Sequence, residues 1–426
     1  MLKKWLALIP VLCLTACGVF SLDVQEEPIR ASAPGSTRTS TPSPVVTGDF
    51  MPTGSPTPTI SPTARPSEPP ALAATPRFRP GESLLLTEVH MVTVDQGWGI
   101  SGPSVLTTAD GGLTWHEVTP PQDLPAGVEA RVFGAFPGNQ SAWVIYSLDD
   151  YIAPDAVVWS TIDGGRTWRA SAPLDHQTVG HVSRAIFSVL NEYTGWLMVS
   201  GSSVAAGQRH SNQLFETFDG GASWTPVGLN EFGVNGIAFA NPQIGWMTME
   251  CSGDCHPNAN QVVATMDGGM VWQYRSLPEP SYEQKLFSEY EYCNSYQVNG
   301  LDPLTVRFLV SCYDYPLTTM VTYLYLTDNG GADWSSALLP ATVDGPQSAL
   351  IFFDAEHGLL LGREIYRTND GGRSWWHVKD VTWDGQFNFV DERNGWAIAR
   401  LGESSALVRT HDRGATWEEL TPHIAP

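Results

Sequence analysis

The chain has 426 residues, with 40 glycines, 32 prolines, 16 tryptophans and a formal net charge of −22. Its 45 acidic residues against 23 basic ones exclude nucleic acid as the expected partner, because phosphate binding needs a basic surface. No strict glycine period and no heptads run through the sequence, which excludes collagen and coiled coils. The abundance of tryptophan together with glycine is the feature that the rest of the sequence has to explain.

The N-terminus has the pattern of an export signal. A basic start, Lys3-Lys4, precedes the apolar stretch Trp5–Leu14, which is too short to span a bilayer as a helix. The residues that follow, Leu14–Cys17 (LTAC), resemble a bacterial lipobox, whose cysteine is acylated after cleavage. We therefore expect residues 1–17 to be a lipoprotein signal peptide and Cys17 to anchor the exported protein to the outer surface of the cell membrane, or to the outer membrane of a cell that has two. The alternative is an ordinary signal peptide with an incidental cysteine.

Residues 18–80 are dominated by three residue types, since 30 of these 63 positions are Pro, Ser or Thr. Such a composition cannot bury a core and favours an extended, solvated backbone. Acidic and basic residues balance here at five each. We expect a flexible linker that holds the rest of the chain away from the membrane.

From residue 81 onward the chain repeats the phrase Thr-x-Asp-Gly-Gly-x-Thr/Ser-Trp. The seven copies span Thr108–Trp115, Thr161–Trp168, Thr217–Trp224, Thr265–Trp272, Thr327–Trp334, Thr368–Trp375 and Thr410–Trp417. Three copies are imperfect, because Val271 and Asp333 replace the Thr/Ser, Asn329 replaces the Asp and Arg413 replaces the first Gly. The tryptophans are separated by 53, 56, 48, 62, 41 and 42 residues, and such intervals are typical of propeller blades.

A second phrase precedes most copies. It reads Gly97-Trp98, Ala142-Trp143, Gly195-Trp196, Gly245-Trp246, Val306-Arg307, Gly358-Leu359 and Gly395-Trp396 in chain order, so the fifth and sixth units only approximate it. Each unit therefore contains four short strands bounded by polar turns. The sequence predicts an all-β fold, a seven-bladed β-propeller of four-stranded antiparallel blades over residues 81–426. How the ring closes is left open, although the segment Ser83–Thr87 could take part.

The repeated phrase lies at the turn between the third and fourth strands, which gives its residues a structural role. The Asp or Asn side chain can accept backbone N–H groups, and the glycines permit positive φ. The expected turn residues are Asp110, Asp163, Asp219, Asp267, Asn329, Asp370 and Asp412. The tryptophans expected to cover the turns and fill the space between blades are Trp115, Trp168, Trp224, Trp272, Trp334, Trp375 and Trp417.

This phrase resembles the Asp-box, or bacterial neuraminidase repeat, of sialidases, sortilin-type receptors and some glycosidases. Seven consecutive units that combine the box with a preceding Gly-Trp strand are more specifically similar to the photosystem II stability and assembly factor family of propellers, whose cyanobacterial members are lipoproteins. The resemblance covers the whole ring, about four-fifths of the chain. It implies a non-enzymatic protein that holds partner proteins, including a nascent reaction-centre subunit, during assembly for photosynthesis.

The ring departs from that family in charge. The cyanobacterial members use a basic surface patch, whereas residues 81–426 contain 16 basic and 40 acidic residues, a net charge of −24. Because the linker is neutral, this imbalance belongs to the ring. We therefore expect a basic or neutral protein or peptide partner, such as a subunit of a membrane complex. We also expect the protein to be a monomer.

A glycan-active or glycan-binding propeller of the sialidase type is the alternative function. A sialidase would require three arginines that converge on a carboxylate; Arg77–Pro80 (RFRP) is faintly similar to its N-terminal motif, but sialidase rings typically have six blades. No Gly-x-Ser-x-Gly or His-Glu-x-x-His motif occurs. Asp175, His176 and His181 could be metal ligands, yet ordinary surface histidines explain them better. We expect no catalytic residue, no metal and no cofactor.

Four cysteines remain outside the signal peptide: Cys251, Cys255, Cys293 and Cys312. An even number in an exported protein favours two disulfides, for which three connectivities are possible. We favour the pairs 251–255 and 293–312. A zinc fragment in residues 251–256 (CSGDCH) is the alternative.

Connections of unequal length suggest a partner-binding face. Those between second and third strands and those between blades emerge on the same face of a propeller, and all four cysteines map there. The interval from the Gly-Trp position to the box Trp is 17 residues in the first unit but 25, 28 and 26 in the next three, and Pro278–Gly300 reads as a further insertion. Exposed tyrosine is favoured at binding surfaces. The candidate binding residues are Tyr282, Tyr290, Tyr292, Tyr296, Tyr313 and Tyr315.

Overall fold

The computed structural model describes residues 77–426 except 154, 176–180, 203–210, 231–232, 251–261, 281–286, 288–291, 314–319 and 341–347. The chain divides into two units, Met1–Ser67 and Glu68–Pro426, and all described residues belong to the second. The expected signal peptide, Cys17 and most of the expected linker therefore lie outside the described residues.

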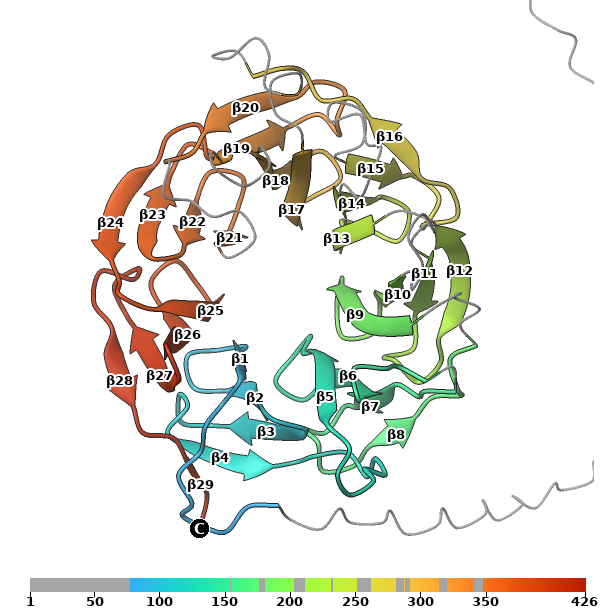
Figure 1. Ribbon diagram of the computed structural model, residues 1–426, viewed down its shortest axis with the longest axis vertical. Helices are drawn as coiled ribbons and strands as arrows, with labels where there is room; N and C mark the ends of the chain where they lie inside the picture. Colours follow the sequence, from blue (N-terminus) through green and yellow to red (C-terminus); the bar gives the residue numbers. More distant parts are fainter. Residues whose placement is uncertain are drawn as a thin grey trace, which may run out of the picture. The chain divides into compact units, whose positions relative to one another are not determined.

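The second unit is an all-β ring of seven sheets, one for each repeat, and each sheet contains four antiparallel strands (Figure 1). Blade one contains β1 (Glu88–Met91), β2 (Gly97–Ser101), β3 (Ser104–Thr108) and β4 (Thr114–Glu117). Blade two contains β5 (Ala130–Ala135), β6 (Ala142–Leu148), β7 (Trp159–Thr161) and β8 (Arg169–Ala170). Blade three contains β9 (His181–Val189), β10 (Gly195–Ser202), β11 (Ser211–Thr217) and β12 (Thr225–Asn230).

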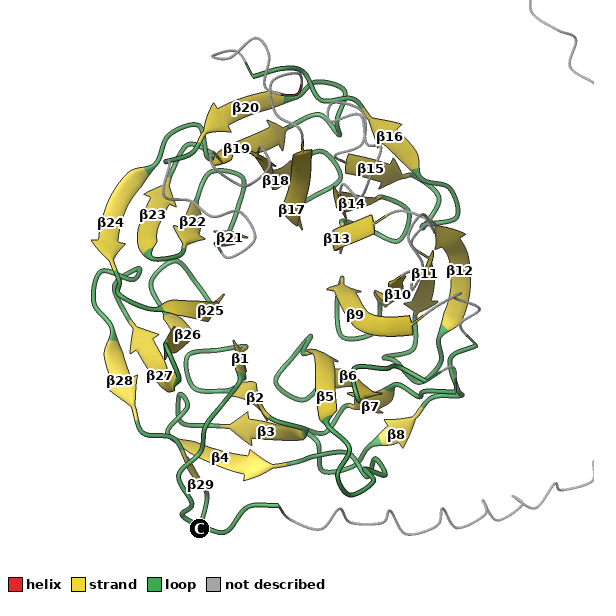
Figure 2. Ribbon diagram, viewed as in Figure 1, coloured by secondary structure: helices red, strands yellow, loops and turns green. Residues whose placement is uncertain are grey.

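The remaining four blades follow the same order. Blade four contains β13 (Gly233–Phe239), β14 (Gly245–Glu250), β15 (Val262–Thr265) and β16 (Gln273–Arg275), and blade five contains β17 (Tyr292–Gly300), β18 (Val306–Tyr313), β19 (Met320–Thr327) and β20 (Ser335–Leu338). Blade six contains β21 (Ala349–Phe352), β22 (Gly358–Leu361), β23 (Glu364–Thr368) and β24 (Trp376–Asp380), and blade seven contains β25 (Asp384–Phe389), β26 (Gly395–Leu401), β27 (Ser404–Thr410) and β28 (Glu418–Leu420). The predicted seven-bladed propeller is confirmed (Figure 2).

The ring closes at blade one through a fifth strand, β29 (His423–Ile424), which pairs in parallel with β4. The segment 81–84 lies beside this strand. The Gly81 N–H donates to the Ile424 carbonyl and the Leu84 N–H to the Pro422 carbonyl, each at 2.9 Å. The segment that the sequence suggested for closure thus takes part, but it acts together with the last residues of the chain. We call residues 81–84 and β29 the clasp.

The cores lie between neighbouring blades, where the two tryptophan phrases meet. Trp143 of β6 packs edge to face against Trp224 in the box of blade three, with ring centroids 5.6 Å apart at 88°. Trp246 of β14 and Trp334 in the box of blade five repeat this arrangement at 6.0 Å and 89°. Because each blade contributes one ring to a seam and its neighbour the other, the tryptophan excess holds the blades together.

One expected insertion is partly wrong. The expected insertion at residues 278–300 includes Tyr292–Gly300, which is β17, the inner strand of blade five. Its period-two pattern is obscured because the bulge between Tyr296 and Asn299 shifts the register against β18. The described residues upstream pack on the same blade: Phe287 is buried, and the Tyr325 hydroxyl donates to the Pro278 carbonyl at 2.8 Å.

Candidate functional site

The seven box turns open on one face of the ring, which we call the box face. In every blade the N–H of the fourth box residue donates to a carbonyl in the turn between the first and second strands, at 2.8–3.1 Å. Gly111 bonds Asp95 in this way, Gly220 bonds Tyr193, and Arg413 bonds Arg393. Both turns of each blade therefore lie on this face. The connections between second and third strands, and those between blades, open on the opposite face, which we call the long-loop face.

Each box turn is held by one repeated set of hydrogen bonds. In blade three, the Thr217 hydroxyl donates to Asp219 Oδ1 at 2.9 Å and accepts the Gly221 N–H at 3.0 Å. Asp219 Oδ1 also accepts the Ser223 N–H, and Oδ2 accepts the Ser223 hydroxyl at 2.6 Å. The box carboxylates are thus engaged within their own turns, and they have the contacts of turn-stabilising groups rather than those of reacting acids.

Hydrogen bonds keep the box aspartates ionised. Partial burial acts to raise the carboxyl pKa above 3.8, but hydrogen bonds from the residue four positions on and from the first Thr outweigh it and lower the pKa in five boxes: Asp110, Asp163, Asp219, Asp370 and Asp412. At Asp267 the N–H of Val271 is the largest cause, followed by the Thr265 hydroxyl, and the pKa is lowered as well.

We expect the ring to lose stability in acid. Since the folded pKa values lie below 3.8, the stabilisation by the boxes is complete above that pH and is lost as the pH falls through the folded values. The melting temperature, measured by circular dichroism, should decline between about pH 4 and about pH 2. The Asp219→Asn variant should start from a lower melting temperature and decline less steeply. A wild-type melting temperature that stays level over this range would contradict the expectation.

Three boxes depart from the repeat, each with a different structural result. In blade five the roles of two side chains are exchanged: Asn329 Nδ2 donates to Asp333 Oδ2 at 3.0 Å, so the turn keeps its cross-link. In blade seven Arg413 adopts φ of 66° where the other boxes have glycine, and its guanidinium pairs with Glu392 at 3.1 Å. In blade four Val271 has no hydroxyl, so Asp267 Oδ2 lacks the bond that Thr or Ser donates elsewhere.

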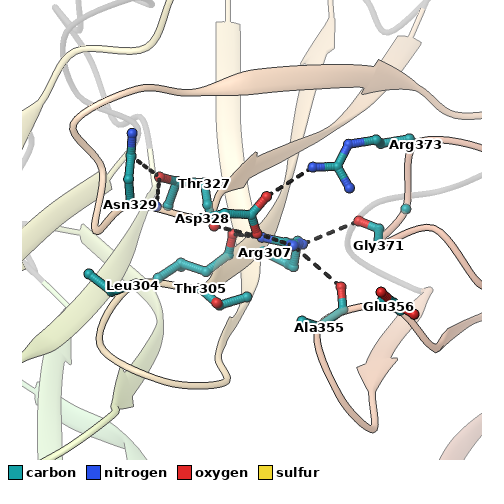
Figure 3. Close-up of polar contacts among 12 residues, drawn as sticks. Leu304, Thr305, Arg307, Thr327, Asp328, Asn329, Ala355, Glu356, Gly371 and Arg373 are labelled. Carbon is teal, nitrogen blue, oxygen red and sulfur yellow. Dashed lines mark hydrogen bonds and ion pairs between the residues drawn. The ribbon is translucent and has the colours of Figure 1, made fainter.

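Arg307 takes the place of the inter-blade tryptophan in blade five. It is 1% exposed, and Val306 lies opposite Thr327 just as Gly97 lies opposite Thr108. Its Nε donates to the Gly371 carbonyl of blade six at 3.2 Å, the same box position that Trp143 reaches in blade three through the Gly220 carbonyl (Figure 3). The guanidinium therefore reproduces the contact that the indoles of Trp143 and Trp396 make.

Asp328 lies between two guanidinium groups at this seam (Figure 3). Arg307 Nη2 contacts its Oδ1 at 2.6 Å and Arg373 Nη2 contacts its Oδ2 at 2.9 Å. Burial acts to raise the pKa of Asp328, but the hydrogen bonds and charges of both arginines lower it. Because every one of these groups is paired, the cluster acts as a latch between blades five and six rather than as an open binding site.

The sequence did not predict one cluster of a histidine and two carboxylates. Ligand-type atoms of Asp354, His357 and Glu392 lie within 4.8 Å of one another. Asp354 Oδ1 accepts the N–H groups of Glu356 and His357, as Asp391 does in the next blade, and the Arg413 guanidinium already pairs with Glu392. The hydrogen bond that Asp354 accepts from the His357 ring is the largest cause that raises the His357 pKa. No sequence motif marks the cluster, because its residues come from turns of two blades.

Only part of the predicted tyrosine face can be placed. Tyr292 and Tyr313 lie opposite each other at the long-loop ends of β17 and β18, with rings stacked at 5.6 Å. Tyr296 is half-buried and packs against the core between blades five and six. Tyr282, Tyr290 and Tyr315 lie outside the described residues.

The pairing of Cys293 with Cys312 is present as a disulfide. It joins β17 to β18 directly beside the tyrosine pair, and both cysteines are fully buried. Cys251 and Cys255 lie outside the described residues, as do His176 and the side chain of His181. In the described part of the chain, no helix has the length and apolar character needed to cross a membrane.

The inner strands bridge the blades with side-chain amides. Gln386 of β25 donates to the Val89 carbonyl of β1 at 2.9 Å and accepts the Val89 N–H at 3.0 Å. The seven inner strands contain two arginines, Arg131 and Arg184. Arg131 lies over the Phe133 ring, and Arg184 donates to two carbonyls of blade four. These strands therefore do not supply the three-arginine cluster that a sialidase would need.

Comparison with solved structures supports the fold. YCF48 bound to a D1 peptide is 16% identical, with a TM-score of 0.50, over 79% of this chain and 97% of the other. YCF48 from Cyanidioschyzon merolae is 16% identical at a TM-score of 0.47, over 78% and 97%. An oligogalacturonate lyase from Vibrio parahaemolyticus is 9% identical at a TM-score of 0.51, over 78% and 92%.

Protein-family models and curated proteins contain no match to the chain. At such low identities the structural likeness shows the propeller fold alone, since YCF48 and a lyase are matched about equally well.

Proposed function

We propose that this protein is a non-enzymatic scaffold that is exported, anchored through Cys17, and binds a protein or peptide partner on the long-loop face. The observation that carries the proposal is the stacked pair of Tyr292 and Tyr313, which the Cys293–Cys312 disulfide holds beside the longest connection between described strands, from Arg275 to Tyr292. Rigid aromatic side chains are favoured anchors for protein partners. A propeller of the same fold has been solved with a bound peptide, which supports this kind of partner.

Replacing both Tyr292 and Tyr313 with alanine tests the binding face. We expect the double variant to recover substantially less of the specific partner than wild type when tagged full-length proteins are used to capture cross-linked partners from membranes of the source cell. Tyr274→Ala is the matched control, because Tyr274 is 47% exposed on the outer strand β16 and lies on neither face. Equal recovery by the double variant, with an unchanged circular dichroism spectrum, would reject this face.

The anchor has a separate test. Cys17→Ser removes the thiol that would be acylated, so we expect the protein to move from the membrane fraction to the soluble exported fraction and to lose metabolic labelling by a fatty-acid analogue. Retention of both label and membrane association would contradict lipidation at Cys17.

The glycan-active alternative is tested by incubating the purified protein with a sialidase reporter and an oligosaccharide panel. We expect no turnover, since the inner strands carry two arginines with other contacts. Turnover that depends on either arginine would replace the scaffold proposal.

A further inference from the structure

The box face is more apolar over blades two to four and more charged over blades five to seven, although Leu304 of blade five is also 56% exposed there. On blades two to four, large apolar side chains at the turns are 55–74% exposed. We call these residues the apolar tips: Ile162, Tyr193, Phe218, Met266, Met270 and Val271. The box positions that correspond to Ile162, Phe218 and Met266 are Asp328, Asn369 and His411 in blades five to seven, where ion pairs such as Arg373–Asp328 and Arg413–Glu392 join the turns.

Folding does not explain the tips of blade four. Val271 stands where five of the other boxes have a Thr or Ser that donates its hydroxyl to the box carboxylate, for example Thr167 to Asp163 at 2.7 Å. Valine gives up that charge-assisted bond and is itself 55% exposed. In blade five the loss of the hydroxyl is compensated by the Asn329–Asp333 bond, whereas valine offers no such replacement. The box pattern is therefore broken at Val271 without any gain in packing, which points to a role of this side chain at the surface.

In the box turn of blade four, three backbone N–H groups already have acceptors within the ring. In blade four the Gly268 N–H donates to the Gln243 carbonyl, the Gly269 N–H to the Thr265 hydroxyl and the Val271 N–H to Asp267. A partner that covers this turn therefore displaces water from apolar side chains and not from orphaned amides, which would be costly to bury. Methionine also adapts its shape to different apolar partners.

Charge decides which partner fits. The six turns of blades two to four on this face carry the carboxylates of Asp163, Glu192, Asp219 and Asp267 against a single guanidinium, that of Arg166. Apolar side chains surrounded by carboxylates complement apolar side chains surrounded by ammonium or guanidinium groups. We propose that the apolar tips form a docking surface for a cationic amphipathic segment of a partner polypeptide.

Two other occupants fit the same surface less well. A second copy of this chain would place the same four carboxylates against each other across a two-fold axis, which is repulsive. An anionic lipid surface would meet the same carboxylates, and basic rather than acidic side chains favour such a surface. The docking surface lies opposite the long-loop face, so it goes beyond the function proposed above and either surface can fail without the other.

Val271→Thr is the decisive variant, because it restores the repeat while it removes an apolar tip. We expect its melting temperature to equal or exceed that of wild type, since the new hydroxyl can donate to Asp267 Oδ2. A loss of binding in this variant cannot then be attributed to unfolding. Met270→Ser, on the same turn, should weaken binding in the same direction. Leu401→Ser is the matched control, because Leu401 is 61% exposed at the β26–β27 hairpin on the long-loop face.

The probes are two synthetic peptides with the same leucine pattern, one with lysine and one with glutamate at the polar positions. With the full-length protein in detergent, fluorescence anisotropy should show binding of the lysine peptide, at least about tenfold weaker binding of the glutamate peptide, and about fivefold or greater weakening by Val271→Thr but not by Leu401→Ser. Added salt should weaken binding of the lysine peptide.

Equal binding of the two peptides, no binding of either, or unchanged binding by Val271→Thr would overturn the proposal. Evidence for a different occupant would also overturn it. Such evidence would be binding to anionic vesicles, or a dimer in light scattering, that Val271→Thr abolishes, together with no binding of the lysine peptide. Failure of the Tyr292 and Tyr313 test, by contrast, would leave these outcomes unaffected.

Discussion

Replacing Arg307 with alanine is expected to lower the free energy of unfolding by about 3 kcal/mol, whereas replacing it with tryptophan should change it by less than about 1 kcal/mol. Arg307 is 1% exposed and donates to carbonyls of Val306, Thr327, Ala355 and Gly371 as well as to Asp328. Alanine leaves a cavity at the seam and removes the donor of every one of these bonds.

Tryptophan is expected to substitute for the arginine because the rest of the seam already has the required form. Phe352 ends the inner strand of blade six, as Phe239 ends that of blade four, and Trp196 stacks on Phe239 at 3.7 Å. An indole at position 307 can stack on Phe352 in the same way and donate to the Gly371 carbonyl. Asp328 keeps its contact with Arg373 and is 47% exposed, so its carboxylate tolerates the loss of the Arg307 guanidinium.

Urea denaturation followed by circular dichroism measures both variants without the complication of an added fluorophore. Arg373→Ala is the control, since this side chain is 55% exposed and its ion pair with Asp328 should contribute little. If Arg307→Ala and Arg373→Ala lower the free energy of unfolding by equally small amounts, Arg307 does not hold blades five and six together. If Arg307→Trp lowers it as much as Arg307→Ala, an indole cannot replace the guanidinium at this seam.

Removing residues 421–426 is expected to open the ring and to lower its stability by at least about 5 kcal/mol. Five backbone hydrogen bonds link this segment to Gly81, Glu82, Leu84, Leu113 and Trp115. Each bond contributes on the order of 1 kcal/mol, and the buried Ile424 side chain adds about 2 kcal/mol. The truncated protein should also expose the edge of β4 and associate through it.

Thermal melting and light scattering of the truncated protein measure these two effects. Deletion of Pro426 alone is the control, because that residue is exposed and makes none of the five bonds. If the truncated protein stays monomeric and has the melting temperature of wild type, the hydrogen bonds between Gln386 and Val89 on the inner strands suffice to close the ring.

The architecture could be predicted from the sequence because each blade repeats the same turn. Thr217, Asp219 and Gly221 make contacts within a few residues of one another, so their spacing in the sequence identifies the turn. The partner of each box tryptophan is also a repeat residue, as Trp143 and Trp224 illustrate. Such local and periodic interactions leave a direct trace in the sequence.

The details that escaped prediction depend on contacts between distant, non-repeated residues. The clasp strand β29 has two residues and no pattern of its own, and it exists only because β4 offers an unpaired edge. The bulge after Tyr296 interrupts the period-two pattern of β17, so this strand was expected to be part of an insertion. The position of Arg307 was expected, since Val306-Arg307 takes the place of the Gly-Trp phrase in the fifth unit. Its bond to Asp328 was not expected, because no repeat residue marks that contact.

The candidate binding residues were harder still. Tyrosine clustering identified Tyr292 and Tyr313, which meet at one end of blade five, but it also included Tyr296, which packs into a seam. The sequence does contain a pattern that marks the apolar tips. The second box position is Ile162, Phe218 and Met266 in three successive blades. A position that is always exposed by the turn geometry should be polar, so a run of apolar residues there indicates a surface role.

The clasp also decides how the ring carries a mechanical load. The N-terminal segment of the described ring, residues 77–84, runs beside the clasp strand, where the Gly81 and Leu84 N–H groups donate to the Ile424 and Pro422 carbonyls. Tension applied through that N-terminal segment therefore acts first on these hydrogen bonds and on the β29–β4 pair, before it reaches the core of any blade. We therefore expect a pull on Arg77 to break the clasp before it separates blade one from blade seven.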